Sequence, residues 1–202
     1  MRASWSTAAI AALLAADHAA AHSFAAGADS YAQFVEGAGV VLSYPSLLLP
    51  PLALGVLLSL WKVDGLPSVW PLYFAGLLAG IALGPIVGPT VSIVLMALGV
   101  LIAALAAILP RHNRVEVSVL AAITGLLLTA ASLEGHSFFE LGFVIPFGIV
   151  FAANLVVATS AATVRVAVEK VDRQWILIGA RVLASWIGAI LVLMLAFALA
   201  NP

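Results

Sequence analysis

Six apolar runs of about 20 residues or more dominate this chain. A helix rises about 1.5 Å per residue, so a run of this length crosses about 30 Å of hydrocarbon. The backbone must satisfy its own hydrogen bonds inside lipid, and the alternating pattern of a membrane barrel is absent, so we expect helices. The predicted spans are residues 37–61, 68–87, 90–109, 115–133, 139–164 and 174–200.

The composition excludes several classes of protein. The 202 residues are 64% apolar and 8% charged, whereas a soluble domain is about 45–50% apolar and about 25% charged. So few charges cannot cover a water-facing surface, and a net charge of −1 offers no basic face for nucleic acid. The absence of cysteine excludes disulfides, thiolate metal sites and cysteine catalysis. The expected fold class is an all-α, polytopic membrane helix bundle in a lipid bilayer.

Residues 1–21 resemble a secretory signal peptide. Arg2 supplies a positive start, residues 8–16 form a short apolar core, and residues 19–21 supply the small residues that signal peptidase needs. Cleavage there would make His22 the first mature residue. The alternative is an uncleaved N-terminal helix. We predict a short extracytoplasmic segment at 22–36 and a six-helix membrane domain at 37–202.

The basic residues of the loops all fall on one side of an alternating six-span arrangement. They lie at residue 62, at 111 and 114, and between 165 and 173, whereas the loops at 88–89 and 134–138 contain no Lys or Arg. By the positive-inside rule the basic side faces the cytoplasm. The sequence therefore predicts a multi-pass protein of the bacterial inner membrane with the mature N-terminus and the C-terminus outside.

Two patterns within the spans bear on packing. Gly76, Gly80, Gly84 and Gly88, which we call the glycine stripe, lie four residues apart. Small residues at this spacing let a neighbouring helix approach closely, within the molecule or in an oligomer.

In the first span Tyr44-Pro45 and Pro50-Pro51 predict a kink or a break, because each proline removes a backbone donor. Broken helices line substrate sites in many transporters, although a plain kink is an alternative.

Three polar residues within the spans need partners. Glu116 and Arg181 lie at compatible depths near the cytoplasmic side, which favours an ion pair between them. Asn154 lies deep in the fifth span, where we expect it to hydrogen-bond a neighbouring helix.

The predicted outer side is acidic and contains no Lys or Arg. Glu134, His136 and Glu140 lie within seven residues of one another between the fourth and fifth spans. Carboxylate and imidazole groups bind nickel, cobalt or zinc, so these residues are candidate metal ligands. The alternative is a solvated loop that excludes positive charge for the sake of topology. An N-terminal His22 adds a fourth candidate, because its amine and ring could chelate copper together with His136.

The chain resembles the HupE/UreJ family of small membrane proteins. The likeness rests on the signal peptide, the histidine that follows it, six short spans and a glycine-rich second span. Residues 34–55 are similar in framing to the family's first span, and only Gly135 and His136 match its second, histidine-rich motif. The histidines and the aspartate of the family's H-P-x-x-G-x-D-H motif are absent from residues 40–47. The resemblance implies a role in nickel or cobalt transport, or in hydrogenase or urease maturation.

Two functions remain as hypotheses. The first is a divergent permease for a transition-metal cation, or a metal-accessory protein. The second is a non-transporting subunit of a larger membrane complex, with copies of itself or with other membrane subunits. We do not expect an enzyme, because no nucleophile–base pair, carboxylate dyad or metal triad falls in a segment that could form a site.

Overall fold

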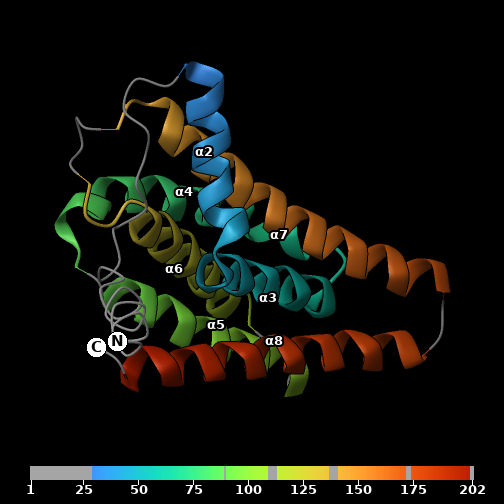
Figure 1. Ribbon diagram of the computed structural model, residues 1–202. Coiled ribbons are helices and arrows are strands. Elements are labelled where there is room, and N and C mark those ends of the chain that lie inside the picture. Colours follow the sequence, from blue (N-terminus) through green and yellow to red (C-terminus); the bar gives the residue numbers. More distant parts are fainter. Residues whose placement is uncertain (1–28, 89, 109–112, 137–140, 172–173, 201–202) are drawn as a thin grey trace, which may run out of the picture.

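The computed structural model describes residues 29–88, 90–108, 113–136, 141–171 and 174–200 (Figure 1). Within these residues the regular structure is entirely helical, which confirms the all-α bundle. The predicted segment at 1–21 lies outside them. The helices are α2 (Ser30–Ser43), α3 (Pro45–Trp61), α4 (Gly65–Leu83), the 3-10 turn η1 (Gly84–Ile86), α5 (Thr90–Ile108), α6 (Arg114–Ser132), α7 (Val144–Val171) and α8 (Gln174–Ala200).

Five helical segments are long and apolar enough to cross a membrane, so the chain is a multi-pass membrane protein. They begin with α4 and its continuation η1 and go on through α5, α6, α7 and α8. The predicted first span differs from these five. It consists of α2 and α3, which meet at an angle of 74°, and the described chain reaches six spans only if this bent pair counts as one.

Local signals explain where the first helices begin. Asp29 caps α2, because its Oδ1 accepts a hydrogen bond from the Ala32 amide at 2.7 Å. The helix therefore begins seven residues before position 37, and the predicted boundary between residues 36 and 37 falls inside α2. The break at Pro45 is as predicted. Tyr44 is extended, as the residue before a proline prefers, and Pro45 occupies the first turn of α3, where no donor is needed.

Pro50 and Pro51 do not break the helix, contrary to the expectation for this pair. Both are buried within a continuous α3. Neighbouring helices compensate for prolines within the membrane. Here α3 contacts every other long helix of the described chain, and the Ser160 hydroxyl of α7 donates to the Leu52 carbonyl at 2.9 Å. The helix is therefore continuous at a pair of prolines where the sequence predicts a kink or a break.

The glycine stripe packs within the molecule, against α6. A Cβ atom at Gly76 or Gly80 would overlap the carbonyl oxygens of Ala122 and Leu126, respectively, and one at Gly84 would lie 2.8 Å from Leu133. Helix α6 contributes a glycine of its own to this contact, Gly125, which faces the carbonyl of Tyr73 in α4. The two backbones therefore touch over several turns. Gly88 has open space around it and takes no part.

The ends of the helices that carry basic residues lie together. Val63 and Arg165 line one small cavity, and Ser68 and Arg114 line another. Arg181 reaches the last carbonyl of α5, at Ile108. We call this end of the bundle, which holds Lys62, Arg114 and Arg165, the basic end. The turn between α6 and α7 lies at the opposite end.

Candidate functional site

The turn after α6 places two of the predicted metal ligands. Gly135 has a φ of 77°, a conformation that residues with a side chain rarely adopt, and it lets the chain reverse after Leu133. The His136 amide donates to the Leu133 carbonyl at 3.2 Å, and its Nδ1 lies 3.1 Å from the Glu134 carbonyl. The Glu134 carboxylate instead accepts from the Ser92 hydroxyl of α5 at 3.3 Å.

This geometry joins the turn to α5. The Glu134 side chain leaves the turn to reach the first helical turn of α5, while the His136 ring folds back onto its own backbone. Glu140 and His22, the other two predicted ligands, lie outside the described residues. Within the described residues, no three His, Asp or Glu side chains come close enough together to hold a metal ion. The four-ligand set therefore stays a prediction.

The break in the first span gathers backbone and side-chain oxygens. The last carbonyls of α2 lack intrahelical donors, as at the end of any helix. Pro50 and Pro51 each deprive a carbonyl four residues earlier of its donor, at Ser46 and Leu47. At the same point Ser43 and Tyr44 are exposed on the surface of the bundle. A group of carbonyl and hydroxyl oxygens thus lies where the first span changes direction.

The start of α3 is satisfied within the chain. The Tyr44 carbonyl accepts from the amides of Leu47 and Leu48, both at 2.9 Å. The negative end of the α2 dipole and the positive end of the α3 dipole meet at the break. The C-terminal end of α2 favours a cation, whereas the N-terminal end of α3 favours an anion.

Polar side chains bridge α4 and α7. The Trp70 indole donates to Asn154 Oδ1 at 2.9 Å, and Asn154 in turn donates to the Val150 carbonyl at 2.8 Å. The Tyr73 hydroxyl, which is fully buried, donates to the Ala153 carbonyl at 3.1 Å. The expected helix-to-helix role of Asn154 is therefore confirmed. The two aromatic partners were not predicted, although aromatic residues one turn apart in a span are the signal that could have indicated them.

Glu116 and Arg181 have different partners. Glu116 belongs to a capping box with Asn113 at the start of α6, where its Oε2 accepts from the Asn113 amide at 3.3 Å. Arg181 donates to the Ile108 carbonyl at 3.3 Å. Each charged side chain thus hydrogen-bonds a backbone group at the end of a helix. The position of each residue within its span did not predict this role.

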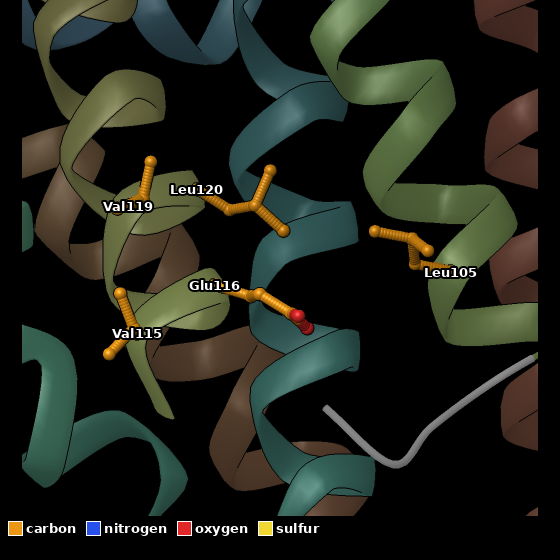
Figure 2. A pocket seen from close by; sticks show the side chains of 5 residues that line it. All are labelled: Leu105, Val115, Glu116, Val119 and Leu120. Atoms are coloured by element: carbon orange, nitrogen blue, oxygen red, sulfur yellow. The ribbon is translucent and has the colours of Figure 1, made fainter. Parts of the chain in front are cut away.

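A cavity of about 470 Å³ opens between α5 and α6 beside Glu116. Figure 2 shows the carboxylate pointing between the two helices, with Leu105 on the facing helix and Leu120 beside it. The other lining residues are Val115 and Val119. Apart from the Glu116 carboxylate the walls are apolar, so the cavity offers no set of metal ligands.

The chain matches no protein-family model, no curated protein and no solved structure.

Proposed function

We propose that the protein is a divergent HupE/UreJ-like permease or accessory protein for a transition-metal cation such as nickel or cobalt. The observation that carries the proposal is the 74° break between α2 and α3. Transporters use interrupted helices of this kind to expose backbone carbonyls and helix ends to a coordinating ion.

The charges of the described residues agree with a cation as the cargo. Asp29, Glu36 and Glu134 lie toward the end of the bundle opposite the basic end. An acidic entrance concentrates cations near the membrane. We place this end outside the cell, with both termini of the mature chain, and the basic end in the cytoplasm of a bacterium.

In this scheme His136 and the carboxylates near it collect the ion. The oxygens at the α2–α3 break then replace part of its hydration shell. Imidazole binds nickel, cobalt, copper and zinc well, and it is the ligand that separates these ions from calcium or magnesium. The scheme therefore assigns selectivity to His136 and passage to the break.

Metal accumulation in cells that express the protein tests the proposal. Expression should raise cellular nickel or cobalt above the level in cells with an empty vector. Replacing His136 and Glu140 by alanine should abolish the increase, and Ser43→Ala with Tyr44→Phe should reduce it. Ser185→Ala, an exposed hydroxyl on α8, is the matched control. Unchanged accumulation of nickel, cobalt, copper and zinc in the His136 and Glu140 double variant would refute the proposal.

A second function, a subunit of a larger membrane complex, is favoured by the surface position of the break. Ser43 and Tyr44 are exposed between two apolar helices. Irregular backbone within a bilayer is tolerated where protein or a water-filled cavity covers it. Because the chain contains no cysteine, Ser43→Cys supplies a unique site for cross-linking in native membranes. A cross-link to a different polypeptide would support the second function, and a protein that remains a monomer in mild detergent would contradict it.

A further inference from the structure

A groove between α4 and α6 opens at the basic end of the bundle. Its volume is about 400 Å³, within the usual range for ligand sites. Its apolar wall includes Leu72 of α4 together with Val119 and Ala122 of α6. Leu72 and Val119 are about half exposed, so the groove faces the surroundings of the bundle, which for a membrane-spanning chain are the lipid tails.

Two polar groups of α6 line this groove. Arg114 and Ser118 are one helical turn apart and therefore lie on the same face of the helix. Ser118 is only 7% exposed, yet its hydroxyl takes part in none of the hydrogen bonds of the described residues. The Arg114 guanidinium likewise makes no ion pair or hydrogen bond within the described chain. Ser118 is buried, and buried polar groups are nearly always satisfied, so its hydroxyl implies a partner from outside the chain, whereas the exposed Arg114 side chain is accessible to such a partner.

Two other cations at this end, Arg165 and Lys62, interact with their own neighbours. Arg165 forms an ion pair with Glu169 at 2.6 Å, and the Lys62 ammonium lies 4.7 Å from the centre of the Trp61 ring. The carboxylate nearest in sequence, Glu116, points to the far side of α6, between that helix and α5 (Figure 2). Arg114 therefore keeps its charge available to a ligand in the α4–α6 groove.

We propose that this groove binds one anionic phospholipid of the leaflet at the basic end, with its phosphate on Arg114 and Ser118 and an acyl chain along Leu72, Val119 and Ala122. A guanidinium matches a phosphate in charge and geometry, and basic pockets between membrane helices bind anionic headgroups. A free phosphate ion would fill only the polar end. The apolar wall therefore favours a lipid.

Lipid titration of the full-length protein in detergent, followed by native mass spectrometry, tests the proposal. The probes are phosphatidylglycerol and phosphatidylcholine with identical acyl chains. We expect one phosphatidylglycerol molecule to bind per protein molecule, with a higher affinity than phosphatidylcholine. Arg114→Gln should weaken phosphatidylglycerol binding about tenfold, the loss of one charge-assisted contact, whereas Lys62→Gln, at the same end but outside the groove, should change it by less than about threefold.

A second pair of variants tests the apolar wall without changing any charge. Leu72→Trp should fill the groove and weaken the binding of both lipids. Leu78→Trp, on the same helix, starts from a similar exposure but lies outside the groove and should leave binding unchanged. Both starting side chains are about half exposed, so the fold should tolerate either change.

Three results would overturn the proposal. The first is an equal loss in the Arg114 and Lys62 variants, which would indicate general attraction to a basic surface. The second is equal affinity for the two lipids. The third is displacement of bound phosphatidylglycerol by millimolar inorganic phosphate, which would identify a site for the free ion.

Discussion

The α4–α6 pair and the α2–α7 pair both have glycines that touch a neighbouring backbone, yet they differ in how far along the helix this contact extends. In the first pair Gly76 and Gly80 of α4, Gly84 of η1 and Gly125 of α6 approach the facing segment over several turns. In the second pair Gly37 faces the Ile145 carbonyl and Gly148 faces that of Phe34. Helix α2 then ends at Ser43 and the chain turns by 74°.

The difference shows what a continuous glycine stripe adds. From Tyr73 to Gly84 each turn repeats the contact, so we expect the two helices to separate only if these contacts are lost together. Helix α2 is short and joined to α3 at a single extended residue, Tyr44, so it can move without displacing the rest of the first span. We therefore expect α4–α6 to be a rigid part of the bundle and α2 to be a part that can move.

The largest loss of stability should come from Gly80→Val. The added side chain would overlap the Leu126 carbonyl, which is helix backbone, and the Thr129 hydroxyl, which is hydrogen-bonded to the Leu77 carbonyl. We expect a loss of about 3 kcal/mol or more in stability, seen as a lower melting temperature in detergent or as aggregation in size-exclusion chromatography. Gly88→Val is the control from the same stripe, because it has open space around it.

Gly37→Val should cost less than Gly80→Val, although it too meets a carbonyl, that of Ile145. Helix α2 can tilt away about Tyr44, so we expect a loss of about 1–2 kcal/mol in the same melting experiment. Gly39→Val, with open space around it, is the control on the same helix. Equal losses for Gly37→Val and Gly80→Val would contradict the difference in rigidity between the two pairs.

Thr129→Val tests the hydrogen bond that accompanies the glycine contacts. The Thr129 hydroxyl donates to the Leu77 carbonyl of α4 at 2.8 Å, and valine keeps its shape but removes the donor. Interhelical hydrogen bonds in membranes are worth about 0.6–1.7 kcal/mol, so we expect a loss near 1 kcal/mol. Thr159→Val is the control, because that exposed hydroxyl bonds only to its own helix, and no difference between the two would contradict the assignment.

Trp70→Phe should have the smallest effect. It removes the indole donor to Asn154 but keeps an aromatic ring beside Phe74, with which Trp70 stacks at 5.3 Å between centroids. Trp70 is 43% exposed, so we expect a loss of about 0.6 kcal/mol in the thermal melt. Trp175→Phe, an exposed residue of α8, is the control. A loss above that of Thr129→Val would mean that the α4–α7 bridge is stronger than its exposure suggests.

Much of the fold was predictable from the sequence, because a segment that crosses the membrane must be helical, apolar and long enough to span the hydrocarbon. The predicted runs 90–109 and 174–200 coincide almost residue for residue with α5 and α8, since apolar length alone defines a span. The extension of α7 beyond residue 164 was not predicted. It continues to Val171, and the ion pair between Arg165 and Glu169 supports this extension at the i, i+4 spacing.

The candidate site was less predictable. His136 and Glu134 are adjacent in sequence, but the turn sends the Glu134 carboxylate to Ser92 of α5. The unsatisfied hydroxyl of Ser118 and the groove beside Arg114 depend on how α4 and α6 approach, which no local pattern encodes. Long-range placement of this kind is settled by packing, because membrane helices associate through close contact rather than through the hydrophobic effect.

The sequence by itself determined the helical class, the position of most of the apolar segments, the break at Pro45 and the glycine stripe that begins in α4. These follow from lipid solvation and backbone chemistry, which act within a single segment. Only the tertiary structure decided that Pro50 and Pro51 stay within a continuous α3, that the stripe faces α6, and that Arg114 lines a groove. Each of these outcomes depends on contacts between helices far apart in the chain, where the neighbour supplies the hydrogen bond, the surface or the empty space.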